Sequence, residues 1–153
     1  MSGMRILIVE SRYYEDITDN LVRGVVKELA AAGAGYKRVI VPGILEIPAA
    51  VRYAIRAMEL RATDERYGGY IALGCAIRGE TDHYDHICRE AMSGLQRLAI
   101  DYTLALGNGI LTVHSHEQAM ARCPPEAGDF GGQAARACLR MIEIKRELSL
   151  LAK

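Results

Sequence analysis

Short apolar runs alternate with helix-like patterns along this chain, and that alternation restricts the fold more than any other feature of the sequence. The run Met4–Glu10 is rich in β-branched residues and is typical of a buried strand. Over residues 16–32, apolar side chains recur every fourth position, as on the buried face of a helix, at Ile17, Leu21, Val25 and Leu29. Gly33 and Gly35 then end the helical pattern. The chain is therefore predicted to begin with a strand and an amphipathic helix.

The same alternation continues through the rest of the sequence. Further strands are predicted at residues 36–41, 69–77 and 104–113, the last interrupted by Gly107 and Gly109. Further helices are predicted at residues 47–60, 82–102, 116–122 and 132–151. This order predicts an α/β fold, a three-layer sandwich in which a four-stranded parallel sheet is flanked by helices. No linker, low-complexity tract or internal repeat divides the sequence, so we expect residues 1–153 to form one domain.

Charge balance and cysteine spacing narrow the classes of function. The chain has 19 Lys plus Arg and 19 Asp plus Glu, so no overall field favours nucleic acid or an anionic membrane as a partner. No apolar stretch approaches the roughly 20 residues that a membrane span needs, and no basic-then-apolar leader opens the sequence. The cysteines form no CxxC pair, which argues against a zinc ribbon or a redox motif; they are Cys75, Cys88, Cys123 and Cys138. We therefore expect reduced thiols in a cytoplasmic protein.

Polar and aromatic residues follow each of the four predicted strands. In open parallel sheets, ligands bind at the carboxyl ends of the strands. The segments at these ends are rich in polar, aromatic or glycine residues: Ser11–Tyr14, Pro42–Glu46, Ala76–His83 and Thr112–His116. We expect the four strand ends to converge on one pocket.

The segment after the third predicted strand is the most informative of the four. Gly79 and Thr81 lie at the start of a predicted helix, where exposed N–H groups and the helix dipole favour an anion. His83 follows in the first helical turn, and an imidazole can accept or donate a proton beside a bound phosphate. The alternative is that Thr81 only caps the helix and that His83 is a surface residue.

A histidine-based metal site is a weaker interpretation. His83 and His86 lie three residues apart on one helix face, and His114 and His116 could supply further ligands. No carboxylate–histidine signature such as HExxH occurs, so we expect no metal and interpret His86 as part of the core or of a solvated helix surface.

Other strand-end residues suit a planar, hydroxylated ligand. The Ser11–Tyr14 segment offers an aromatic face for stacking on a heterocycle, although a tyrosine packed in a loop is the simpler interpretation. Glu46 opens a helix and could accept hydrogen bonds from polyol hydroxyls, or serve only as a favourable charge at the helix N-terminus. Arg122 precedes a Pro-Pro loop and could clamp a phosphate or remain solvated.

Six ordered segments together resemble the lumazine synthase family over nearly the whole chain. They are Ser11-Arg-Tyr13, Val41-Pro-Gly-Ile-Leu-Glu-Ile-Pro48, Leu73-Gly-Cys-Ala-Ile-Arg-Gly-Glu-Thr-Asp-His-Tyr-Asp85, Asn108-Gly-Ile-Leu-Thr-Val113, Glu117-Gln-Ala-Met-Ala-Arg122 and Gly131-Gly-Gln-Ala-Ala135. The third segment, together with the second, is highly specific. The resemblance implies a flavodoxin-like fold and condensation of 5-amino-6-(D-ribitylamino)uracil with 3,4-dihydroxy-2-butanone 4-phosphate, with loss of phosphate, to give 6,7-dimethyl-8-ribityllumazine. This chemistry, a step of riboflavin biosynthesis, requires no metal or organic cofactor.

By position, the resemblance makes His83 the proton-transfer residue, with Glu80 and Thr81 holding the phosphate largely through backbone N–H groups. The other positions it implies within one subunit are Tyr13 for stacking on the pyrimidine, Ile44, Leu45 and Glu46 for the ribityl chain, and the backbone of Cys75, Ala76 and Ile77 for the pyrimidine edge. Asn108 and Arg122 would reach the site from a neighbouring subunit. The resemblance therefore implies a homo-oligomer, a pentamer or a multiple of pentamers.

Three positions depart from the family pattern. Phe130 replaces a common lysine, His114-Ser115 replaces glutamate-asparagine, and Asn108 replaces a frequent aromatic residue. These departures motivate an alternative, a slow or non-catalytic paralogue that binds a flavin or lumazine. A flavodoxin-like signalling or electron-transfer domain is a further alternative, and the absence of a Ser/Thr-rich phosphate loop after the first strand counts against it.

Overall fold

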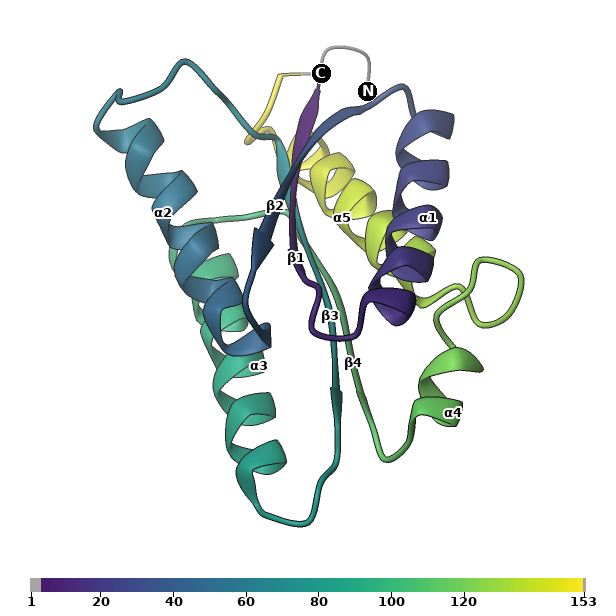
Figure 1. The fold of residues 1–153 in the computed structure, drawn as a ribbon. Helices are drawn as coiled ribbons and strands as arrows, with labels where there is room; N and C mark the ends of the chain where they lie inside the picture. The colour runs from purple at the N-terminus through teal and green to yellow at the C-terminus, as the bar shows by residue number, and fades with distance from the viewer. Residues whose placement is uncertain (1–3, 153) are drawn as a thin grey trace.

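The computed structural model describes residues 4–152 and shows strands and helices in close alternation (Figure 1). The strands are β1 (Arg5–Ser11), β2 (Gly35–Val41), β3 (Gly69–Ile77) and β4 (Leu106–Val113). The helices are α1 (Glu15–Ala31), α2 (Ile47–Glu59), α3 (His83–Asp101), α4 (His116–Met120) and α5 (Phe130–Glu147), with a 3-10 turn η1 (Ile44–Glu46) before α2.

All four strands are parallel and lie in the order β2-β1-β3-β4. In the register, Ser11 pairs with Val41, and Ile77 at the end of β3 pairs with Val113. The carboxyl ends of the strands therefore meet at one edge of the sheet. The predicted α/β sandwich with a four-stranded parallel sheet is confirmed.

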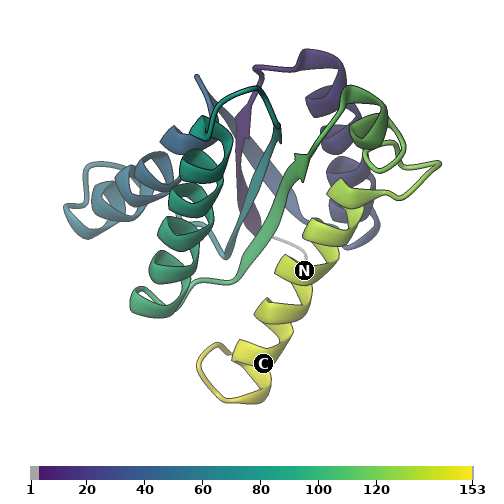
Figure 2. The same ribbon diagram turned by 90° about the horizontal axis from the view of Figure 1, so that it is seen from below.

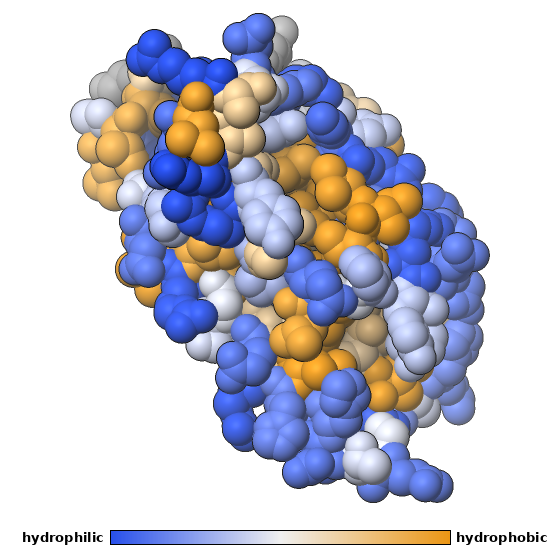
Figure 3. Space-filling model, turned by 60° about the vertical axis from the view of Figure 1, so that its left-hand side comes forward, coloured by the Kyte–Doolittle hydropathy of each residue, from blue (hydrophilic) through white to orange (hydrophobic). Residues whose placement is uncertain are grey.

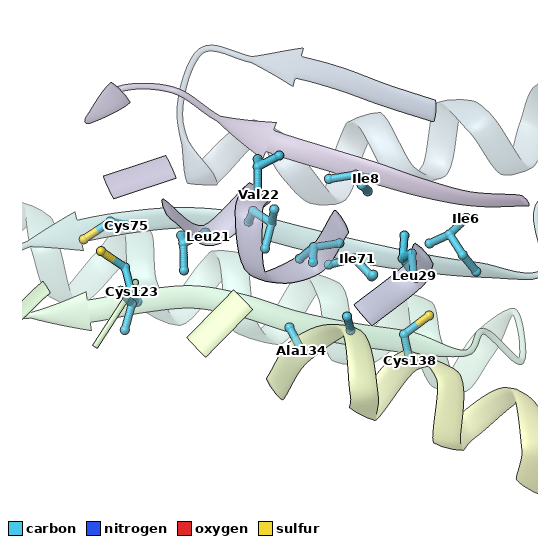
Figure 4. Close-up of a cluster of buried hydrophobic side chains, with 14 of the residues drawn as sticks. Ile6, Ile8, Leu21, Val22, Leu29, Ile71, Cys75, Cys123, Ala134 and Cys138 are labelled. Atoms are coloured by element: carbon cyan, nitrogen blue, oxygen red, sulfur yellow. The ribbon is translucent and has the colours of Figure 1, made fainter. Parts of the chain in front are cut away.

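Successive side chains of β1 point to opposite faces of the sheet. Ile6 and Ile8 pack into a core under α1 and α5, which also contains Leu21, Ile71 and Cys138 (Figure 4). Leu7 and Val9 belong to a second core under α2 and α3. Both cores consist of fully or almost fully buried side chains, as the strand pleat requires when helices cover both faces. Figure 2 shows the two helix layers on opposite sides of the sheet.

Two glycines allow α5 to lie unusually close to its neighbours. A Cβ atom at Gly107 in β4 would come within 2.0 Å of the carbonyl oxygen of Ala134 in α5. A Cβ atom at Gly131 would come within 2.1 Å of the carbonyl oxygen of Leu21 in α1. Both distances are far below van der Waals contact, so a side chain at either position excludes this packing.

Some predicted bounds were wrong by a few residues. Strand β4 runs through Gly107 and Gly109 without interruption, because these glycines fit beneath α5. Helix α5 starts at Phe130 and ends at Glu147, rather than spanning 132–151: the Asp129 side chain accepts a hydrogen bond from the Gly132 N–H, and Ser149 has a left-handed φ of 65°. The predicted helix 116–122 ends at Met120.

Candidate active site

A cavity of about 550 Å³ opens at the carboxyl edge of the sheet. Its walls come from the segments that follow β1, β2 and β3 and from the first two turns of α3. Three of the four predicted strand-end segments are therefore brought together. The fourth, Thr112–His116, does not line the cavity: it follows β4, at the edge of the sheet opposite β2, and the cavity lies at the ends of the other three strands.

Most of the side chains expected at a substrate site line this cavity. The predicted residues that do so are Tyr13, Ile44, Leu45, Glu46, Cys75, Ala76, Ile77, Thr81 and His83. Glu80, Asn108 and Arg122 lie outside its lining and are exposed. One chain therefore brings most of the expected residues together at the cavity, whereas Glu80, Asn108 and Arg122 lie outside it.

The turn after β1 presents an aromatic side chain at the cavity. Tyr13 is 75% exposed, and its ring lies 4.9 Å from that of Tyr14 in an edge-on arrangement. An exposed aromatic face beside a cavity is available for stacking on a flat ligand.

The η1 turn places Glu46 at the cavity while one neighbouring side chain anchors the turn in the core. Gly43 is extended (φ −151°), and the Glu46 N–H donates to its carbonyl at 3.2 Å. Ile44 is 4% exposed and packs in the core under α2. A Cβ atom at Gly43 would lie 3.2 Å from Glu46 Oε1, so the carboxylate lies directly over this glycine. The Pro-Gly pair therefore gives the Glu46 carboxylate room beside the main chain.

The connection between β3 and α3 exposes unpaired backbone donors at the cavity. Among residues 4–152, no acceptor bonds the N–H groups of Glu80, Thr81 or Asp82, and α3 begins directly afterwards. The Thr81 hydroxyl accepts a hydrogen bond from the His83 N–H at 3.3 Å, so the capping interpretation of Thr81 holds in part. Free N–H groups at the N-terminus of a long helix form a site for an anion such as phosphate.

Two residues of α3 line the cavity although they were not predicted from the sequence. Tyr84 and Ile87 face the sheet together with Cys88 and Ala91, at the spacing of one helical face. That spacing is the feature of the sequence from which the two residues could have been predicted to face the sheet. Burial raises the pKa of Tyr84, whose ring lies 5.4 Å from the Arg78 guanidinium.

The histidines form separate contacts. His86 Nε2 lies 3.2 Å from Asp82 Oδ2 on the surface of α3, and His116 Nε2 lies 2.6 Å from Asp16 Oδ2. The His114 ring packs edge-on against Tyr84 at 6.4 Å. Within residues 4–152, no cluster of three or more potential metal ligands occurs.

Cys75 contributes to the cavity wall as a neutral group. Burial raises the pKa of its thiol to about 12. The thiol form dominates at neutral pH, so Cys75 is not an activated nucleophile. Its place in the cavity wall is compatible with the expected backbone contacts.

Asn108 and Arg122 are held on the surface. Asn108 Nδ2 lies 3.0 Å from Met92 Sδ, and its Oδ1 accepts from the Ile110 N–H. An Arg122 Nη1 group donates to the Gln118 carbonyl at 2.8 Å. Neither contact brings the side chain to the cavity of its own chain.

The fold and the cavity define an α/β protein with a pocket of small-molecule size at the carboxyl edge of a parallel sheet. The model of a sequence family described as 6,7-dimethyl-8-ribityllumazine synthase matches residues 3–146. The chain belongs to this family of enzymes.

Curated relatives cover almost the whole chain. A 6,7-dimethyl-8-ribityllumazine synthase of Paramagnetospirillum magneticum is 50% identical over 95% of this chain and 97% of its own length. Proteins named 6,7-dimethyl-8-ribityllumazine synthase 1 are 50% identical in Rhodopseudomonas palustris, over 97% of this chain and 90% of the relative, and 51% identical in Rhizobium meliloti, over 95% and 94%.

Proposed function

We propose that this protein condenses 5-amino-6-(D-ribitylamino)uracil with 3,4-dihydroxy-2-butanone 4-phosphate to form 6,7-dimethyl-8-ribityllumazine and inorganic phosphate. The observation that carries the proposal is the cavity itself. It joins unpaired backbone donors, a histidine, an exposed aromatic ring and a carboxylate in a protein of the matching family. The reaction needs an imine, loss of phosphate, ring closure and dehydration, and these steps require orientation and proton transfer.

The phosphate-bearing substrate is proposed to bind at the N-terminus of α3. The free N–H groups of Glu80 and Thr81 would hold the phosphate, and the helix dipole favours its charge. His83 lines the cavity next to this loop and is exposed, so its ring is free to transfer a proton near the carbon that loses phosphate. Glu80 itself does not line the cavity, whereas Gly79 and Thr81 on either side of it do.

The pyrimidine substrate is proposed to occupy the remainder of the cavity. Tyr13 would stack on its ring, and the backbone of Cys75, Ala76 and Ile77 would bond its edge. Glu46 would accept hydrogen bonds from the ribityl hydroxyls, beside Ile44 and Leu45. In this proposal the two substrates bind at different parts of the cavity, with their reacting groups next to each other.

We further propose a homo-oligomer, a pentamer or a multiple of pentamers, in which Asn108 and Arg122 complete a neighbour's site. Large side chains with apolar surface are exposed on β2, α2 and α3, among them Ile40, Tyr53 and Ile100. Figure 3 shows hydrophobic surface on this side of the molecule. Exposed apolar surface that gathers on one side of a protein supports an interface between subunits. A native mass equal to the 16.8 kDa chain in solution would contradict the assembly.

We also propose that residues 1–153 form one domain and that the protein is cytoplasmic. Residues 1–3 and 153 lie outside the part of the chain that the structure describes. Within the described residues, no helix has the length and apolar character needed to cross a membrane.

The experiment that tests the function is an absorbance assay with both substrates against the uncatalysed background. We expect turnover that saturates in each substrate, and His83→Ala is expected to slow it by about 10- to 100-fold. His86→Ala is the matched control, because His86 is exposed on the same helix and its ring contacts Asp82. Absence of turnover by the folded wild-type protein would contradict the proposed function, and equal rates for the two variants would remove His83 from proton transfer.

A further inference from the structure

A fully buried carboxylate lies at the end of β1, behind the cavity. Glu10 is 0% exposed, and its neighbours in the register are Ile40 on β2 and Leu73 on β3. Its side chain does not line the cavity. Burial of a carboxylate costs free energy unless other groups compensate its charge and satisfy its oxygens.

Two arginines compensate this charge from different elements. Arg38 on β2 donates from Nε to Glu10 Oε2 at 2.8 Å and from Nη2 to Oε1 at 2.7 Å. Arg12 donates from Nη1 to the same Oε1 at 2.9 Å. The bidentate Arg38 pair fixes the orientation of the carboxylate, and the carboxylate in turn fixes one side of Arg12.

Arg12 is held on its other side by α1. Its Nη2 group donates to Asp19, and this hydrogen bond is the main reason why the pKa of Arg12 is raised. The guanidinium therefore bridges the sheet and the first helix. Only 18% of the Arg12 side chain is exposed and the Glu10 side chain is fully buried, so solvent screens this pair less than an ion pair at the surface, whereas the Asp19 side chain is 62% exposed.

The bridge lies in the turn that presents Tyr13. Thr18 closes the two ends of this turn: its hydroxyl donates to the Ser11 carbonyl at 2.7 Å, and its N–H donates to the Tyr14 carbonyl at 3.0 Å. Between these ends, the side chain of Arg12 supplies the tether to Glu10 and Asp19. Tyr13 itself is 75% exposed and its ring packs edge-on against Tyr14 of the same turn, so the conformation of the turn sets the position of the ring.

We propose that Glu10 is a positioning residue for the pyrimidine substrate: through Arg12 it fixes the turn that holds the Tyr13 ring at the cavity. The inference rests on the proposed function, because it takes Tyr13 as the stacking surface. Glu10 and Arg38 lie outside the lining of the cavity and act through Arg12. An apolar side chain at position 10 would fill the core without the cost of a buried charge, and it would leave Arg12 without its anchor on the sheet.

The test compares Glu10→Gln and Arg12→Lys with Arg5→Gln as the matched control. Glutamine keeps the volume of Glu10 and removes its charge, whereas lysine keeps the charge of Arg12 but offers one nitrogen in place of two. Arg5 begins the same strand and pairs with Glu65 at 2.6 Å, away from the cavity. KM is measured separately for each substrate, and binding of ribitylaminouracil alone is measured by titration calorimetry.

We expect both variants to raise KM for ribitylaminouracil by about 3- to 10-fold, the contribution of one aromatic stacking contact. KM for the phosphate substrate is expected to stay within about twofold, and the double variant is expected to add little to either single one, since both weaken the same tether. Arg5→Gln is expected to change neither KM.

Equal rises in both KM values, additive effects, or unchanged binding of ribitylaminouracil would overturn the positioning role. If Glu10→Gln does not fold, Arg12→Lys decides, because Arg12 is partly exposed and its replacement leaves the Glu10–Arg38 pair intact. Wild-type protein that neither binds ribitylaminouracil nor forms the lumazine would instead contradict the proposed function.

Discussion

Replacing Gly107 with alanine tests how closely α5 packs on the sheet. The added Cβ atom would lie 2.0 Å from the Ala134 carbonyl oxygen and 2.8 Å from its carbon, where Cβ atoms essentially never come closer than 3.0 Å. The obstructing atoms belong to the backbone inside an 18-residue helix, so no side-chain rotation relieves the clash. We expect a loss near the upper end for overpacked cores, about 3 kcal/mol. For a chain of this length, that lowers Tm by about 6–12 °C.

Thermal unfolding followed by circular dichroism measures the effect, with all samples at one protein concentration because assembly makes Tm depend on concentration. Gly35→Ala is the matched control: Gly35 also lies in the sheet, and its added Cβ atom would meet the Met4 carbonyl oxygen at an ordinary 3.6 Å. We expect this control to change stability by no more than about 0.5 kcal/mol. A Gly107→Ala protein as stable as the control would refute the inferred packing of α5.

Three further predictions concern the thiols, one surface pair and the neighbouring subunit. Because burial raises the pKa of Cys75 and of Cys138 to about 12, we expect a thiol reagent at pH 8 to leave both unmodified in folded protein and to label both in urea, as mass spectrometry would show. A hydrogen bond with His116 lowers the pKa of Asp16 below its ordinary 3.8. The pair therefore stabilises the fold above pH 3.8, and this stabilisation is lost as the pH falls through the folded-state pKa. A difference in stability between wild type and Asp16→Asn that persisted in strong acid would contradict this. For Arg122→Ala we expect weaker binding of the phosphate substrate with little change for the pyrimidine, and titrations showing equal weakening of both would argue against the assignment.

Most of the segments that line the cavity can be predicted from the sequence, because they follow the predicted strands. The segments after β1, β2 and β3 line it because parallel strands bring their carboxyl ends to one edge. The segment after β4 was expected there too, and it is not, since the order of strands in a sheet is a property of the whole fold. Tyr84 and Ile87 were not predicted to line the cavity, because the buried face of a helix is ordinarily interpreted as core.

The charged network behind the cavity was not predicted. In the sequence, Glu10 is the last residue of an apolar run, Arg12 is part of a polar turn and Arg38 lies within a separate strand. The three meet only because β1 and β2 pair in a register that places Glu10 opposite Ile40, so that Arg38 can reach across to its carboxylate. A shift of the register by one residue would turn Arg38 to the other face of the sheet.

The sequence by itself determined which segments form strands and helices, their approximate bounds and the family, because apolar periodicity and short motifs depend on residues close together in the chain. Tertiary structure decided which strand lies at the edge, how closely α5 approaches Gly107, and which polar groups surround Glu10. It also decided that Asn108 and Arg122 point away from the cavity of their own chain. These features depend on contacts between residues far apart in sequence, and such contacts are fixed only when the whole chain packs.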